Sequence, residues 1–172
     1  MEQGDKVLWS KGLVLSPQHL QAHDRFLEGL VGAQRWLEFY PWGFRRLEFD
    51  HEALAGGVVK IVSAAGILPD GLAFDVPDAD VAPFARQIEN AFLADQTRLL
   101  VHFAIPERRP GARNVSPESD GAGTRYRADI VALRDENSGL SERPIEVARK
   151  NLKLLTGTES LEGHSTLACA RI

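Results

Sequence analysis

The fold begins with the stretch Leu8-Trp9-Ser10-Lys11-Gly12-Leu13-Val14-Leu15-Ser16-Pro17-Gln18-His19-Leu20-Gln21. Its apolar first half, together with Val7, predicts a short, buried extended run. Ser16 and Pro17 then predict the start of a helix, because a serine side chain can accept a hydrogen bond from a free backbone N–H and proline at the first helical position loses none. The stretch contains no nucleophile, phosphate-binding loop or metal-binding set of side chains. It is therefore suited to packing against another surface rather than to chemistry.

A long amphipathic helix is predicted from Pro17 to about Phe39. Apolar residues recur at spacings of three, four and seven positions, which places them on one side of a helix. The helix is expected to end at Tyr40-Pro41, because proline disfavours helical geometry in the residue before it. The apolar stripe consists of Leu20, Leu27, Leu30, Val31 and Leu37, widened by Phe26, Ala33 and Trp36.

The pattern changes from helical to extended after Trp42. Short runs rich in Val, Ile and Phe alternate with polar residues and are separated by turn residues. Residues 84–95 are ambiguous, with a helical bias. One helix followed by many short strands predicts a mainly β protein, an antiparallel β-sandwich carrying one N-terminal α-helix. We expect the extended segments at residues 44–49, 58–67, 72–76, 98–105, 125–133, 144–155 and 167–172.

Two connections differ from the ordinary links between these strands. Pro69, Asp70 and Gly71 predict a tight turn, because proline presets one torsion angle and an Asp-Gly pair tolerates a positive φ. Residues 106–123 are polar and rich in Pro, Gly, Ser and Arg, which is typical of a mobile loop, here expected to join two antiparallel strands. No repeat is visible, and a chain of 172 residues is expected to form a single domain over residues 1–172.

The composition narrows the class of protein. Hydrophobic residues make up 44% and charged residues 26% of the chain, as in ordinary globular proteins. The net charge of −4 argues against nucleic acid as a main partner, since phosphate binding needs clustered Lys and Arg. Cys169 is the only cysteine, so an internal disulfide is impossible. The polar, acidic N-terminus and the shortness of the apolar runs predict a soluble, cytoplasmic protein that does not insert into a membrane.

Candidate metal ligands are few and poorly spaced. His19 and His23 lie four residues apart on the predicted helix, next to Asp24, and this spacing can supply two ligands. A third ligand is missing, so polar or capping roles are the better interpretation. A group of aspartates suggests calcium, but its spacing differs from that of an EF-hand loop and turn formation explains it better. These aspartates are Asp70, Asp75, Asp78 and Asp80.

No catalytic motif is present in the sequence. The chain lacks a GxSxG nucleophile elbow, a phosphate-binding Walker loop and a GxGxxG dinucleotide motif. Gly121-Ala122-Gly123 lies in the polar loop rather than between a strand and a helix. Cys169 lies in an apolar run that is typical of a buried, inert thiol. We therefore expect neither enzymatic activity nor a cofactor.

Several short motifs occur in a specific order along the chain. They are Trp9-x-x-Gly12-x-x-Leu15-x-Pro17-Gln18-His19-x-Gln21, Trp42-Gly43, Leu47-x-x-Asp50 and Gly66-x-Leu68-Pro69-Asp70-Gly71-x-x-Phe74-Asp75-x-Pro77. In this order they resemble the N-terminal region of the TssK family (also called VasE or ImpJ), the baseplate subunits of the bacterial type VI secretion system. The resemblance covers essentially the whole chain. Leu20 departs from it, because the family usually has phenylalanine there.

The resemblance implies an architecture and a set of partners. Family members are longer and similar to the receptor-binding proteins of siphophages, with a β-sandwich shoulder, a helical neck that forms a trimer and a C-terminal head. The shoulder attaches to the baseplate wedge proteins TssF and TssG, and the head reaches the membrane proteins TssL and TssM. This chain resembles the shoulder alone, so the resemblance implies a structural adaptor domain.

Residues for docking on the wedge are expected in the opening stretch. Trp9, Leu13, Leu15 and Leu20 supply more apolar area than a short terminal strand needs, and aromatic residues are good interface anchors. The candidate partner-binding set also includes Pro17 and His19. The alternative is that these side chains only seat the helix on the sandwich.

A different class of function also stays open. A stand-alone carbohydrate- or ligand-binding β-sandwich would use exposed aromatic rings for stacking. Its candidate stacking residues are Trp9, Trp36 and Trp42. Core and helix packing is the simpler interpretation of these three side chains.

Overall fold

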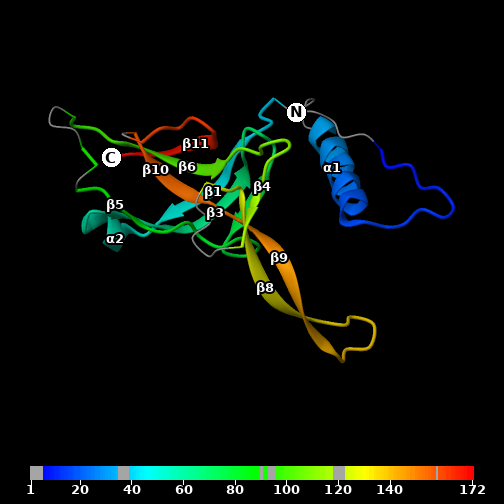
Figure 1. The fold of residues 1–172 in the computed structure, drawn as a ribbon. Coiled ribbons are helices and arrows are strands. Elements are labelled where there is room, and N and C mark those ends of the chain that lie inside the picture. Colours follow the sequence, from blue (N-terminus) through cyan, green and yellow to red (C-terminus); the bar gives the residue numbers. More distant parts are fainter. Residues whose placement is uncertain (1–5, 35–38, 90, 93–95, 118–122, 158) are drawn as a thin grey trace. The chain divides into compact units, whose positions relative to one another are not determined.

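The computed structural model describes residues 6–34, 39–89, 91–92, 96–117, 123–157 and 159–172. Within it the chain divides into two units, Met1–Trp42 and Gly43–Ile172. The first unit contains a long helix and the second contains the strands (Figure 1). The boundary follows the change of sequence pattern at Trp42. Neither helix in the described part of the chain is both long and apolar enough to cross a membrane.

The first unit is built on helix α1, which spans Pro17–Gln34. The predicted helix start at Pro17 is confirmed. Phe39 and Tyr40 lie outside the helix, whereas residues 35–38, which include Trp36 and Leu37, lie outside the described residues, so the predicted end at about Phe39 stays a prediction. The backbone leaves helical geometry before Pro41, as expected for residues that approach a proline.

The second unit consists mainly of β-strands with one short helix, α2 (His51–Ala55), which the sequence analysis missed. Asp50 caps α2 by accepting a 3.0 Å hydrogen bond from the backbone N–H of Ala53. The strands are β1 (Gly43–Phe49), β2 (Val58–Val59), β3 (Ile61–Ile67), β4 (Ala73–Val76), β5 (Arg86–Gln87), β6 (Leu100–Pro106), β7 (Val115–Ser116), β8 (Tyr126–Arg134), β9 (Glu142–Lys150), β10 (Lys153–Thr156) and β11 (His164–Arg171).

Two antiparallel sheets, with strand orders β1-β3-β4 and β10-β6-β11, enclose the hydrophobic core. Three phenylalanine rings join them: Phe103 of β6 lies 4.7 Å from Phe74 of β4 and 5.7 Å from Phe44 of β1, measured between ring centroids. Such tilted and edge-to-face contacts add to the stabilisation that comes from burial alone. The predicted fold class, mainly β and antiparallel after an N-terminal helix, is confirmed.

Gly66 marks the closest approach of backbone within the first sheet. It pairs with Phe44 across β1 and β3. A Cβ atom at this position would collide with the carbonyl oxygen of Gly43 and lie 2.9 Å from the ring of Phe74. Only glycine therefore allows β1 and β3 to lie this close together, which explains the glycine in the motif that precedes the Pro69 turn.

The segment predicted as one strand over residues 58–67 is in fact two strands in different sheets. β2 pairs with β5, whereas β3 pairs with β1 and β4. The break falls at Lys60, whose carbonyl oxygen accepts a 2.9 Å hydrogen bond from Asp50 N–H and whose Nζ lies 2.9 Å from Asp50 Oδ2. A contact with a residue ten positions away thus overrides the local β preference.

Two further predictions need correction. The helical bias of residues 84–95 is wrong for the described part, because Arg86–Gln87 forms β5 and Ile88 N–H donates to Gly57 O at 3.0 Å. The single extended segment over residues 144–155 is divided between β9 and β10. The chain changes sheet at Asn151, where the backbone N–H donates to Arg125 O at 2.9 Å and the side chain donates to Thr124 O at 2.8 Å.

A separate sheet, β7-β8-β9, contains a long hairpin that we call the β8–β9 arm (residues 126–150). β8 and β9 pair antiparallel over nine residues each, whereas β7 pairs only with the first two residues of β8, in parallel. Figure 1 shows the arm extending away from the two core sheets. β7 lies inside the loop expected over residues 106–123 and was not predicted. Because β6 and β8 belong to different sheets, this loop does not join paired strands; residues 118–122 lie outside the described residues, and the mobility of the loop stays a prediction.

Candidate functional site

The opening stretch contains a turn and, over residues 6–16, no helix or strand. Leu13 N–H donates to Ser10 O at 3.2 Å, and Gly12 within this turn has φ of 86°. The predicted buried run is wrong: residues 6–16 contain no strand, and Trp9, Leu13 and Leu15 are exposed. The turn interrupts the run, so its apolar residues cannot pair as a strand.

The start of α1 is held by a local hydrogen-bonding unit. Pro17 is the first helical residue, and His19 N–H donates to Ser16 O at 3.0 Å. The His19 ring reaches back, with Nδ1 lying 2.8 Å from Ser16 Oγ and accepting a 3.2 Å hydrogen bond from Ser16 N–H. The bond from Ser16 N–H to the ring is one half of a capping box, with histidine in the place usually taken by glutamate. Pro17 and His19 thus fix where the helix begins.

Trp9 packs against the same end of the helix. Its ring centroid lies 6.4 Å from that of His19, at a tilt of 35°, and 6.1 Å from that of His23, nearly edge-on. The spacing of four residues places both histidines along one side of α1, where they form a seat for the indole. In the residues that the structure describes, no three His, Cys, Asp or Glu side chains are grouped so as to hold a metal ion.

The remaining apolar side chains of this region are exposed. Val14 is 84% exposed, Leu15 59% and Trp9, despite its histidine seat, 51%. Leu8 and Val14 were missed as candidates, although the unbroken apolar run at 13–15 contains the signal. We define the N-terminal apolar surface as Leu8, Trp9, Leu13, Val14, Leu15 and Leu20. Leu27, Leu30 and Val31, which belong to the predicted helix stripe, are exposed as well.

The predicted turn at residues 69–71 connects β3 and β4. Gly71 N–H donates to Leu68 O at 2.8 Å, and Gly71 has φ of 92°. Asp70 Oδ1 accepts a 3.1 Å hydrogen bond from Leu72 N–H, and Asp70 Oδ2 lies 2.6 Å from Nη1 of the buried Arg125. The carboxylate of Asp70 in this turn therefore contacts Arg125, which lies 55 residues further along the chain, directly before β8.

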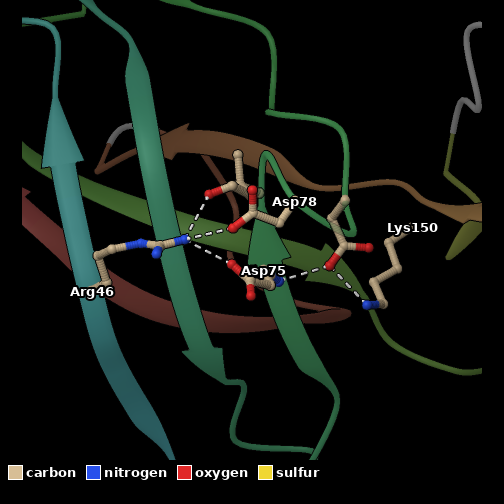
Figure 2. Close-up of polar contacts among 6 residues, drawn as sticks. Arg46, Asp75, Asp78 and Lys150 are labelled. Atoms are coloured by element: carbon tan, nitrogen blue, oxygen red, sulfur yellow. Dashed lines mark hydrogen bonds and ion pairs between the residues drawn. The ribbon is translucent and has the colours of Figure 1, made fainter.

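The other aspartates of the acidic stretch also contact basic side chains (Figure 2). Arg46 Nη2 lies 2.8 Å from Asp75 Oδ1 and 3.5 Å from Asp78 Oδ2. Lys150 Nζ lies 2.8 Å from Asp80 Oδ2. Each carboxylate thus already has a positively charged partner, and the stretch joins β1, β4 and β9 instead of forming an open ring of oxygen ligands.

The remaining candidate residues are scattered. Trp42 is exposed and Trp36 lies outside the described residues, so no stacking platform formed by the three tryptophans is visible in the described part of the chain. Cys169 donates a 3.2 Å hydrogen bond from Sγ to Val101 O. Burial raises the pKa of its thiol to about 11, which keeps it protonated at neutral pH.

Comparison with known proteins gives a consistent result. A family described as "Bacterial Type VI secretion, VC_A0110, EvfL, ImpJ, VasE" matches residues 19–172. The chain is 37% identical over 175 residues to the type VI secretion system baseplate component TssK1 of Pseudomonas aeruginosa, covering all of this chain and 38% of that protein. The chain thus spans well under half the length of this relative.

Solved structures agree with this match. A crystal structure of TssK superposes with a TM-score of 0.84 at 29% identity, over 98% of this chain and 38% of the other. A TssK-TssF-TssG baseplate subcomplex contains a chain with a TM-score of 0.87 at 22% identity, over 99% and 56% respectively, which supports the fold alone. Taken with the family match over residues 19–172, these likenesses show that the chain belongs to the TssK (VasE/ImpJ) family of type VI secretion proteins.

Proposed function

We propose that this chain is the wedge-binding domain of a TssK-type baseplate subunit, and that it docks on TssF and TssG through the N-terminal apolar surface. Membership of the family supports a role in the baseplate, and a relative with 37% identity is named as a baseplate component. A chain of the same fold occurs in a complex with TssF and TssG. The domain then acts as a structural adaptor that holds partners together without chemistry.

The observation that carries this proposal is the exposure of large apolar side chains close together in sequence. Leu8, Val14 and Leu15 lie within eight residues and are all more than half exposed. Contiguous exposed apolar patches on a folded protein commonly mark interaction sites. Within the first unit itself, these side chains are not covered by the helix.

The hydrogen bonds at the start of α1 favour the same interpretation. The bonds between Ser16 and His19 fix the first turn, and the histidine seat holds the Trp9 ring at that turn. A surface whose side chains are ordered before binding loses less conformational entropy on association. Pro17 and His19 thus act as positioning residues, whereas the exposed apolar side chains make the contacts.

The wider role follows from the resemblance to full-length TssK proteins. In a complete subunit the remaining neck and head would form the homotrimer and reach TssL and TssM, so that the adaptor links the baseplate to the membrane complex on its cytoplasmic side. This part of the proposal concerns the whole protein. The domain described here supplies the end that faces the wedge.

Binding of this chain to purified TssF–TssG from the same bacterium tests the proposal directly. Leu15→Asp and Val14→Asp should each weaken the complex at least tenfold, about 1.4 kcal/mol, while the melting temperature stays unchanged. Phe84→Asp is a matched control, because Phe84 is an exposed apolar residue of the second unit. This control should bind like the unsubstituted chain. Biolayer interferometry gives the affinities, and calorimetry the melting temperatures.

The other outcomes separate the alternatives. If Leu15→Asp abolishes cooperative melting, the segment belongs to a core. If Leu15→Asp and Val14→Asp fold and bind normally, the wedge docks elsewhere on the domain. A shift of the melting temperature by oligosaccharides would favour the carbohydrate-binding alternative.

A further inference from the structure

We propose that Asp70 and Asp80 form a two-point anchor that holds the β8–β9 arm in one direction relative to the core sheets. The inference concerns the second unit alone and does not depend on the docking proposal. It is carried by two ion pairs, one directly before the first strand of the hairpin and one at the last residue of its second strand. Both join a basic residue at the root of the arm to an acidic residue beside β4.

Away from its root, the arm is largely surrounded by solvent. Beyond Ala128 its side chains are mostly exposed, and among the described elements only β7, with two residues, pairs with it. Nine residues per strand at about 3.3 Å each make an arm roughly 30 Å long, so a small rotation at the root moves the tip by several ångströms. An isolated two-stranded ribbon gives no reason for one fixed angle.

The first anchor is at the start of β8. Arg125, directly before Tyr126, is 7% exposed and places Nη1 2.6 Å from Asp70 Oδ2 and 3.0 Å from Pro106 O. Burial alone lowers the pKa of Arg125, but the nearby charge of Asp70 and its hydrogen bond raise it overall, so the guanidinium stays charged. This contact ties the root of β8 to the β3–β4 turn and to the end of β6.

The second anchor is at the end of β9. Lys150 Nζ lies 2.8 Å from Oδ2 of Asp80, a side chain that is only 8% exposed. The same Oδ2 accepts a 2.9 Å hydrogen bond from Asp75 N–H, and Asp80 N–H donates to Asp75 O at 2.8 Å. Asp75 in turn contacts Arg46 of β1, so the connection runs from the arm to the outer strand of the first sheet (Figure 2).

Two separate attachment points fix a direction, whereas one allows rotation. Arg125 and Lys150 lie at neighbouring positions of the two strands, because Lys150 is the cross-strand partner of Tyr126. Their acidic partners flank β4 in the sequence, one in the turn before it and one in the loop after it. The two ion pairs therefore attach the root of the arm at two places, and loss of either leaves only one of them.

The distance between two nitroxide labels tests this arrangement. One label replaces Val62 on β3 and the other replaces Glu136 at the tip of the arm, in a Cys169→Ala background. Double electron–electron resonance should give one narrow distance distribution for the unsubstituted anchor. Asp70→Asn and Asp80→Asn should each widen it at least twofold. Asp129→Asn is the matched control, because it removes a 3.3 Å pair with Arg149 that lies within the arm itself.

Every result of this experiment decides the question. A broad distribution with both anchors intact overturns the proposal, and so does a narrow one that persists in both anchor variants. Equal widening by Asp129→Asn would show that the arm bends within itself rather than at its root. If the aspartate variants do not fold, Lys150→Met tests the second anchor from the side of the arm. If it too fails to fold, the pairs are needed for folding and a separate positioning role is overturned.

Discussion

The core sheets and the opening stretch use the same residue types for opposite purposes. In the sheets, Val101, Phe103 and Ile105 are completely buried in the hydrophobic core. In the first unit, Leu8, Val14 and Leu15 are just as apolar and are mostly exposed. Hydropathy alone therefore does not separate a buried core residue from an exposed one. What separates them here is the presence or absence of a pairing strand.

Truncation of one residue from each region gives the largest expected contrast. Phe103→Ala should cost about 3–5 kcal/mol of unfolding free energy, because it removes a buried ring that contacts Phe44 and Phe74. Leu15→Ala should change it by less than about 0.5 kcal/mol, as for other exposed positions. Urea denaturation of both variants measures the difference. Equal losses would mean that the opening stretch is packed as tightly as the core.

Gly71→Val tests the core-sheet region at the turn between β3 and β4. Gly71 has φ of 92°, a conformation that a branched side chain disfavours, so the loss should be about 1–2 kcal/mol. Partner binding should be unaffected. Gly71→Asn should recover part of the loss, because asparagine visits positive φ more readily. An unchanged melting temperature for Gly71→Val would contradict the role given to this turn.

The smallest effect is expected at the polar edge of the sandwich. Burial alone raises the pKa of Glu159, but hydrogen bonds from Thr156 and the charge of Arg86, 2.6 Å away, lower it overall from 4.5. Because the folded state has the lower pKa, this group stabilises above about pH 4.5 and ceases to do so as the pH falls. The contribution should stay below about 1 kcal/mol, since both side chains are partly exposed to solvent.

Unfolding of Glu159→Gln as a function of pH checks this sign. The variant should be less stable than the unsubstituted chain near neutral pH, and this difference should shrink as the pH falls below 4.5. Glu162→Gln, an exposed carboxylate nearby, should show no such convergence. A constant difference at every pH would mean that shape rather than charge matters at Glu159.

The sequence predicted those features that depend on neighbouring residues. Ser16-Pro17 marks the helix start, and alternation locates most of the strands, because the physical causes act within a few positions. The anchors of the arm could not be predicted, since Arg125–Asp70 and Lys150–Asp80 join residues 55 and 70 positions apart. The strand break at Lys60 was missed for a related reason: its contact with Asp50 competes with a strong local β pattern.

The exposure of the opening stretch was missed for a different reason. In a sequence, a run or an alternation of apolar residues has the same pattern whether the side chains are buried in a core or exposed to solvent. His19 was noticed for its metal-ligand spacing, yet its ring bonds to Ser16 and supports Trp9. The candidate set was proposed because its residues supply more apolar area than a short terminal strand needs. A capping role was among the interpretations of the two histidines, whereas the packing of Trp9 on their rings was not predicted.

The β8–β9 arm also has a consequence for solubility. β9 is the outer strand of its sheet and presents backbone groups that a strand from another molecule can pair with. Its sequence resists such pairing: Pro144 lacks a backbone N–H, and charged side chains are frequent along the strand. These charges are Glu142, Arg143, Glu146, Arg149 and Lys150. An arm of this composition can extend into solvent at high protein concentration without recruiting copies of itself into a growing sheet.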